Sequence, residues 1–161
     1  MYIYLPSKNT ESMRLEDEIK QQKFESEIQK LMINQLFTGK WVNDLISKYL
    51  KPHGLTTQQY NVLRILRGQH PKSISVNSIA VRMIDKMSNV SRLIDKLKDK
   101  GHVNRNINPD DRRQVDIEIT DSGLKLLEEL DEVQKQIKSH FNTLTEKEAK
   151  QLNDLLDKLR G

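Results

Sequence analysis

The feature that most constrains the fold of this chain is one change of hydrophobic period immediately after Gly101. Before this glycine, apolar residues recur every three or four positions, which is typical of amphipathic helices. After it the residues alternate, with Val103, Arg105 and Ile107 before a bend at PDDRR, and Val115, Ile117 and Ile119 after it. The alternation predicts a hairpin with one face packed inward. We therefore expect a mainly α fold that carries one two-stranded β-hairpin.

Helix boundaries are marked by residues that cap the free backbone groups of a helix end. A long helical run begins at Met13, can be kinked or divided by Gly39, and ends before Pro52. Thr56 and Thr145 each precede a Gln or Glu three residues later, which is the pattern of a capping box. The remaining helices are expected near 57–68, 76–83, 86–100 and 122–142, with a last one after Thr145.

The order of helix, short helix, second helix and hairpin is a winged helix-turn-helix arrangement. With 161 residues the chain is long enough for one compact unit with its own core. We expect a loose tail over 1–12, an N-terminal helical segment over 13–51, a winged lobe over 52–120 and C-terminal helices over 121–161.

Charge and composition narrow the classes of partner. The net charge is +4, and twelve lysines and arginines stand against six acidic residues between Pro52 and Asp116. A basic central segment is compatible with binding double-stranded DNA. The absence of cysteine excludes disulfides and thiolate metal sites. No export signal or membrane-spanning stretch is evident, so we expect a cytoplasmic protein without membrane contact.

The helix expected over 86–100 has a face suited to reading DNA. Val90, Leu93, Ile94 and Leu97 share a buried stripe, which leaves an outer face with Ser88, Asn89, Arg92 and Lys96. A recognition helix contacts bases mainly through its N-terminal turns. Arg92 is the best candidate for guanine, because its two forked donors match two adjacent acceptors. The alternative is an ordinary solvated helix face.

The bend of the hairpin places two acids beside two arginines. Such a tip can reach the adjacent minor groove, whose narrow, negative channel favours arginine. Asp111 can orient Arg113 for this contact, while Arg112 points to the other side of the strand and touches phosphate. The alternative is an exposed ion-pair cluster that only keeps the turn soluble.

The stretch SNVSRLIDKLKDKGHVNRNINPDDRRQVDIEITDSG, residues 88–123, resembles the recognition helix and wing of the MarR family of bacterial transcription regulators. The resemblance rests on the Ser/Thr-rich helix start, on Leu97, Lys100 and Gly101, on the wing pair Asp111 and Arg113, and on Thr120 and Gly123. The helices from about 25 to 160 agree in order and length.

The resemblance implies a ligand-responsive repressor that acts as a homodimer on a pseudo-palindromic operator. Its N- and C-terminal helices would interleave, Arg113 would enter the minor groove, and Ser88, Asn89 and Arg92 would sit in the major groove. Two apolar stripes give separate support for a dimer, one of Leu152, Leu155, Leu156 and Leu159, the other of Leu127, Leu130, Ile137 and Phe141. Packing within one chain is the alternative use of these stripes.

Members of this family often release DNA when a small aromatic or phenolic acid binds. Four residues lie in segments that would border such an effector crevice, namely Trp41, His53, Tyr60 and Arg64. They can supply aromatic walls and a cationic donor. Trp41 and Tyr60 can equally be ordinary core residues.

Other functions find little support in the sequence. The four histidines are scattered without ligand spacing, so we expect no metal site, no cofactor and no enzyme activity. One alternative is a winged-helix protein-interaction module without useful DNA affinity, since Asp85, Asp95 and Asp99 would oppose phosphate. Against this stands the expectation that the outer face of 86–99 has no aromatic or apolar anchor. A small-molecule carrier or enzyme that uses the crevice is a third possibility.

Overall fold

The computed structural model describes residues 13–108 and 114–161, and the chain divides into a unit that ends at Asp44 and a unit that begins at Leu45. In the first unit lie α1 (Leu15–Glu18) and most of α2 (Glu27–Leu50). The helical run expected from Met13 is wrong over 19–26, which is not helical. Lys20 has a left-handed φ of 57°, a conformation that does not propagate a right-handed helix. Gly39 does not divide α2.

One ion pair joins α1 to the start of α2. Lys30 Nζ donates to Glu16 Oε1 at 2.6 Å, and the side chain of Glu16 is only 10% exposed. This hydrogen bond, followed by one from the Glu16 backbone, lowers the pKa of Glu16 to about 2. The short helix is therefore held by a carboxylate that stays charged at all ordinary pH values.

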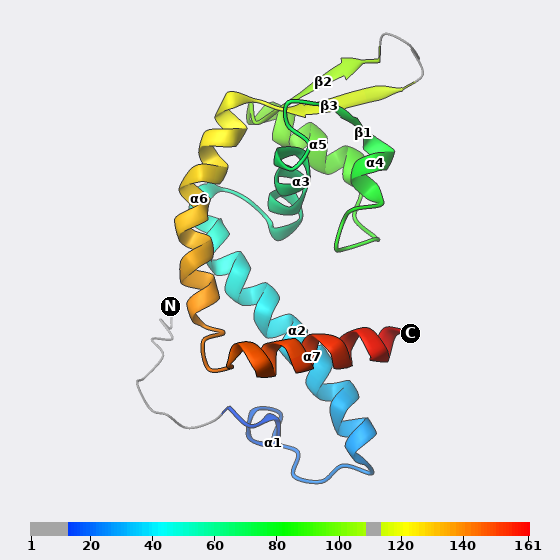
Figure 1. Cartoon of the computed structure of the whole chain (residues 1–161), viewed down its shortest axis with the longest axis vertical. Helices are drawn as coiled ribbons and strands as arrows, with labels where there is room; N and C mark the ends of the chain where they lie inside the picture. Colours follow the sequence, from blue (N-terminus) through cyan, green and yellow to red (C-terminus); the bar gives the residue numbers. More distant parts are fainter. Residues whose placement is uncertain (1–12, 109–113) are drawn as a thin grey trace. The chain divides into compact units, whose positions relative to one another are not determined.

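The second unit contains the remaining elements, shown in Figure 1. They are the 3₁₀ turn η1 (Lys51–His53), α3 (Thr57–Arg67), β1 (Ile74–Ser75), α4 (Val76–Ala80), α5 (Val90–Asp99), β2 (Val103–Ile107), β3 (Val115–Ile119), α6 (Asp121–Ser139) and α7 (Glu146–Arg160). The capping boxes at Thr56 and Thr145 are confirmed, since each hydroxyl accepts from the backbone three residues on and the Gln59 or Glu148 side chain reaches back.

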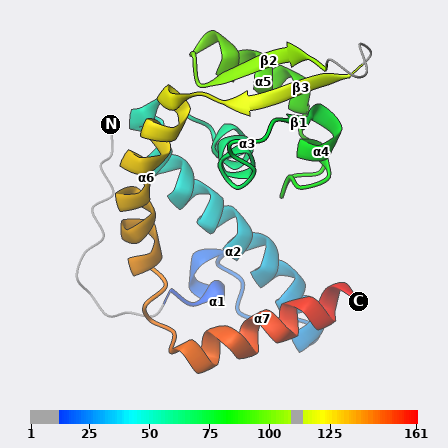
Figure 2. The same cartoon turned by 45° about the horizontal axis from the view of Figure 1, so that its top comes forward.

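The expected hairpin is confirmed, with Val103 opposite Ile119 and Ile107 opposite Val115. Its inward packing holds for Val103, Ile117 and Ile119, whereas Ile107 is 69% exposed. The hairpin belongs to a three-stranded antiparallel sheet, because β1 pairs with β3 and gives the order β1-β3-β2. The two-residue β1 was not predicted, since so short a strand has no period. Figure 2 shows β2 and β3 running together as the projecting ribbon of this sheet.

The core of the second unit forms between α3, α5 and the sheet. Its buried side chains are Leu50, Leu55, Val62, Leu63, Leu66, Ile79, Met83, Val90, Ile94, Leu97, Val103, Ile117, Ile119, Leu127 and Leu130. Helix α6 is fixed to α3 by Arg67, whose Nη1 donates to both carboxylate oxygens of Asp131 at 3.0 Å. Helix α5 and the hairpin of β2 and β3 therefore rest on one continuous apolar core.

Two helices keep large apolar side chains in solvent. None of the residues of α7 is buried, and Leu152, Leu155 and Leu159 are between 46% and 63% exposed. On α2, Ile28, Met32 and Leu36 are at least 64% exposed. Such stripes at helical spacing are typical of surfaces that pack against another protein. No helix in the described ranges is both long and apolar enough to cross a membrane.

Candidate nucleic-acid interface

Helix α5 has the buried stripe that its sequence predicts. Val90, Ile94 and Leu97 are buried and Leu93 is half-buried. The helix begins at Val90 rather than near residue 86, because Asn89 caps it: Asn89 Oδ1 accepts from the backbone N–H of Arg92 at 3.1 Å. Ser88 and Asn89 therefore lie just ahead of the first turn.

The turn that leads into α5 is organised by Asp85. Its Oδ1 accepts from the backbone N–H of Met87 at 3.0 Å, and its backbone carbonyl accepts from the N–H of Ser88. The bond from Met87 lowers the pKa of Asp85, with further contributions from the side chains of Ser88 and Gln58. The carboxylate thus acts as an acceptor for its own turn.

The exposed side of the α5 N-terminus carries Asn89, Arg92 and Lys96. These residues line a shallow depression of about 340 Å³ together with Gln58, Asp85, Ser88 and Leu93. Asn89 and Arg92 side chains are exposed, whereas the Ser88 hydroxyl is buried. The arrangement gives a polar surface of one amide and two cations, which suits contact with base edges and phosphates.

Asp95, an acid of α5, is paired with an arginine of the hairpin formed by β2 and β3. Arg105 of β2 donates from Nη1 to Asp95 Oδ1 at 2.8 Å. The pair joins the recognition helix to the first wing strand and removes one of the charges expected to oppose phosphate. With Asp85 also turned into its own loop, the cations of α5 dominate the N-terminal surface.

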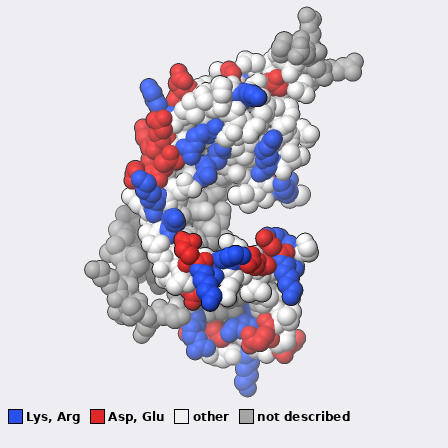
Figure 3. All heavy atoms as spheres, in the orientation of Figure 1, with Lys and Arg blue, Asp and Glu red and all other residues white. Residues whose placement is uncertain are grey.

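Charge is unevenly distributed on the face drawn in Figure 3. Acidic side chains gather along α6, whereas lysine and arginine side chains lie over the region of α3 to α5. The acids of α6 include Glu128, Glu129 and Glu132, all exposed. A polyanion would be attracted to the α5 side of the unit and repelled by the exposed side of α6.

Polar side chains are hydrogen-bonded to one another across the hairpin of β2 and β3. The amides of Asn104 and Asn106 both donate to Glu118 Oε1, and Asn108 donates to Asp116. The first two bonds cross from β2 to β3, and the third joins the residue after β2 to β3, so together they stiffen the hairpin. The three residues expected at its tip, Asp111, Arg112 and Arg113, lie outside the described residues.

The expectation that 86–99 exposes no apolar anchor is wrong. Met87 is 93% exposed, and Ile84 just before it is 87% exposed. The helix was expected to begin near residue 86, which would have made Met87 part of it. Because the helix begins only at Val90, Met87 belongs to the turn and its side chain faces solvent.

Of the four effector candidates, the structure brings two together. Arg64 lies over the ring of Tyr60, 5.8 Å from its centroid, and its Nη1 donates to the hydroxyl at 3.4 Å. His53 ends η1 and is half-buried, and Trp41 is half-buried in the first unit. Their common crevice remains a prediction.

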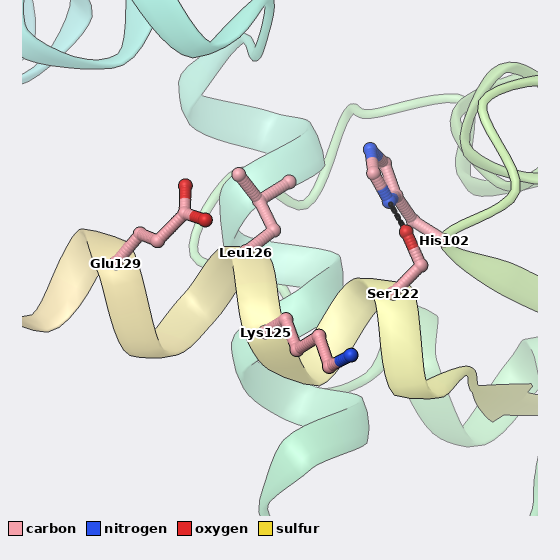
Figure 4. Close-up of a pocket in the computed structure, with 5 residues that line it drawn as sticks. All are labelled: His102, Ser122, Lys125, Leu126 and Glu129. Atoms are coloured by element: carbon pink, nitrogen blue, oxygen red, sulfur yellow. Dashed lines mark hydrogen bonds between the residues drawn. The ribbon is translucent and has the colours of Figure 1, made fainter.

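Sequence reasoning missed one hollow in the second unit. His102, Ser122, Lys125, Leu126 and Glu129 line an open pocket of about 490 Å³ (Figure 4). His102 Nδ1 lies 3.2 Å from Ser122 Oγ, and burial followed by the charge of Lys100 lowers the pKa of His102. Both effects favour the neutral imidazole. Because His102 precedes β2 and the other residues lie on α6, no local motif marks this pocket.

No group of three or more histidines and acids with metal-binding geometry occurs in 13–108 or 114–161.

Comparison with known proteins gives a consistent picture. The family model described as MarR family matches residues 55–115. The chain is 35% identical to the transcriptional repressor MdtR of Bacillus subtilis over 111 residues, which cover 68% of this chain and 70% of MdtR. It is 29% identical to the transcriptional repressor IacR of Pseudomonas putida, over 74% of this chain and 70% of IacR.

Solved structures agree with the fold. A MarR transcription factor from Planctomyces limnophilus matches with a TM-score of 0.66 and 33% identity, over 84% of this chain and 98% of that one. A cysteine-to-serine mutant of MarR from E. coli, crystallised with operator DNA, matches with a TM-score of 0.75 and 26% identity, over 86% and 99%.

Proposed function

The chain belongs to the MarR family and is a transcription regulator of that type, and on this premise we propose that it is a homodimeric, ligand-responsive repressor of a pseudo-palindromic operator. The observation that carries the proposal is the exposed surface of Asn89, Arg92 and Lys96 at the start of α5. The neighbouring acids Asp85 and Asp95 are engaged by the protein itself. Asp95 is paired with Arg105, so the cations of this surface outnumber the one acid beside it, Asp85, that has no ion pair within the described residues.

Within this proposal each residue has a role. Arg92 donates to a guanine in the major groove, Asn89 contacts bases or phosphates, and Lys96 neutralises phosphate. Ser88 joins these contacts only if its hydroxyl, buried in the single chain, turns outward on binding. Arg113 enters the minor groove with Asp111 as its orienting partner, and Arg112 contacts phosphate. The crystallised complex of E. coli MarR with operator DNA supports duplex DNA as the partner.

The homodimer is supported by the apolar stripes of α2 and α7. Leu155 and Leu159 on α7 and Leu36 on α2 remain more than half exposed in the single chain. Burying such side chains stabilises an assembly by about 1.5–3 kcal/mol each before the costs of association. Two copies would place two α5 helices on successive half-sites about 10 base pairs apart.

The DNA interface is tested by the salt dependence of affinity. A duplex from the region upstream of the protein's own gene would be titrated by fluorescence anisotropy between 50 and 200 mM salt. Several phosphate contacts predict a steep linear fall of log affinity with log salt. A flat dependence, or no binding to any selected duplex, would contradict the proposal.

Single variants separate the two reading elements. Arg92→Ala removes a bidentate base contact and is expected to weaken binding by about 1–3 kcal/mol, roughly 5- to 150-fold. Arg113→Ala should also weaken binding markedly, with unchanged helix content by circular dichroism. Lys138→Ala is the matched control. It removes one positive charge from α6 rather than from α5, so it should lower the DNA affinity much less than Arg92→Ala does. Normal binding by the Arg113 variant would show that the wing role is wrong.

The effector response requires its own test. Aromatic and phenolic acids would be screened for a rise in melting temperature, since a ligand that binds only the folded state stabilises it. We expect a stabilising acid to lower DNA affinity, and Tyr60→Ala or Arg64→Ala to lose both effects. An acid that stabilises the protein but leaves DNA affinity unchanged would favour a carrier instead.

A further inference from the structure

Three large apolar side chains project into solvent from the turn between α4 and α5. Val81 is 64% exposed, Ile84 is 87% exposed and Met87 is 93% exposed. They lie within seven residues of chain and end one residue before Ser88. Scattered exposed apolar residues are ordinary, but a group immediately ahead of a recognition helix is a continuous part of its surface.

Hydrogen bonds fix the backbone of this turn. The backbone N–H of Ile84 donates to Asn61 Oδ1 of α3 at 2.9 Å, and that of Met87 donates to Asp85 at 3.0 Å. Lys86 Nζ donates to the carbonyl of Val81 at 2.7 Å, while Met83 is buried in the core. A preformed turn displays its apolar groups with little further loss of backbone entropy on binding.

The surroundings of this group are cationic. Arg82 and Lys86 lie within the turn, and Arg92 and Lys96 follow on α5. Only two acids, Asp85 and Asp95, lie among these four cations, and Asp95 is paired with Arg105. An occupant must therefore combine negative charge with small apolar groups. Duplex DNA satisfies both conditions, because the C5 methyl of thymine is the apolar group that bases present in the major groove.

We propose that Ile84 and Met87 read thymine methyl groups beside the bases contacted by α5. The inference rests on the proposed DNA-binding function and adds to it a preference for thymine at defined positions. The turn then contributes sequence specificity that donors such as Arg92 do not supply, because the methyl group carries no hydrogen-bonding capacity.

The test uses duplexes that differ only in these methyl groups. The full-length protein would select its preferred duplex from a random pool, and that duplex would be made with thymine or with deoxyuridine at each invariant thymine. Removal of one contacted methyl should weaken binding about fourfold, the worth of one buried methyl-sized group. The Ile84→Ala, Met87→Ala double variant should bind both duplexes equally well.

The Arg92→Ala variant is the matched control. It should weaken binding to both duplexes while keeping the thymine preference of the unaltered protein. Equal binding of both duplexes by the unaltered protein, or a thymine preference retained by the double variant, would overturn the inference and leave DNA binding intact. If the unaltered protein bound neither duplex, the proposed DNA-binding function would be contradicted, and so would the inference that rests on it.

A second copy of the chain is the competing occupant of the turn. Sedimentation of the double variant distinguishes it, since loss of the dimer with an unchanged thymine preference would assign these side chains to a protein interface and overturn the inference. An unchanged dimer with loss of the preference is the expected result.

Discussion

Substitution of Gly123 by alanine tests the junction between the wing and α6. An added Cβ would lie 2.4 Å from the carbonyl oxygen of His102 and 2.7 Å from Ile119 Cγ1. The carbonyl cannot retreat freely, because it accepts from the backbone N–H of Thr120 at 3.1 Å. Gly123 is itself held by the cap, since its N–H donates to Thr120 Oγ1.

The magnitude follows from two opposing terms. Overpacking of this kind costs about 1–3 kcal/mol, and a clash with backbone belongs at the upper end. Alanine recovers up to about 1 kcal/mol of helix propensity. The net loss is about 2 kcal/mol, which for a chain of this size lowers the melting temperature by about 4–8 °C. Differential scanning calorimetry at fixed protein concentration measures it, since an oligomer melts at a concentration-dependent temperature.

Gly68→Ala is the matched control in the same unit. Its added Cβ meets only the carbonyl oxygens of Ile65 and Arg64, at 3.5 and 3.6 Å, which is ordinary contact. Its φ of −67° suits alanine, so stability should be unchanged or higher by about 0.4–1 kcal/mol. If the Gly123 variant were as stable as the Gly68 variant, the close approach of α6 to the start of β2 would be refuted.

Three further predictions concern other contacts. Because the pKa of Glu16 falls from 4.5 to about 2 on folding, its ion pair with Lys30 should stabilise the protein fully above pH 4.5 and progressively less as the pH falls toward 2. In urea melts, Glu16→Gln should reduce the loss of unfolding free energy over this acid range. An unchanged loss would exclude the ion pair as its cause. A double-mutant cycle of Arg67→Ala and Asp131→Ala should give a coupling of about 0.5–1 kcal/mol, because both side chains are partly exposed; strict additivity would contradict it. Leu155→Asp with Leu159→Asp should shift sedimentation from a dimer toward the 18.9 kDa chain, whereas Asn153→Asp on the same helix should not.

Much of the fold follows from local sequence signals. Thr56 and Thr145 predict helix starts, because a capping box is formed by two residues that lie three positions apart in the sequence. The alternation around the bend predicts β2 and β3, and the stripe of Val90, Ile94 and Leu97 predicts the buried side of α5. Each of these signals lies within one element, so no knowledge of the tertiary structure is needed.

The features that escaped prediction depend on contacts between distant segments. One exception is local: the Asn89 cap starts α5 only at Val90, so Met87 lies in the preceding turn with its side chain in solvent. The Arg105–Asp95 ion pair depends on how the wing packs against α5. Strand β1 is defined by its pairing with β3, which lies about forty residues later in the chain. Periodicity cannot report these three-dimensional effects.

The central claim is that the N-terminal surface of α5 binds duplex DNA, and hydrogen exchange tests it most directly. The full chain would be labelled with and without the duplex that it selects, and exchange followed by mass spectrometry. The account predicts slower exchange in peptides that span Ser88 to Lys96, with no comparable change in α6, whose exposed side is acidic. Protection confined to α6 or α7, with α5 unchanged in the bound protein, would contradict it.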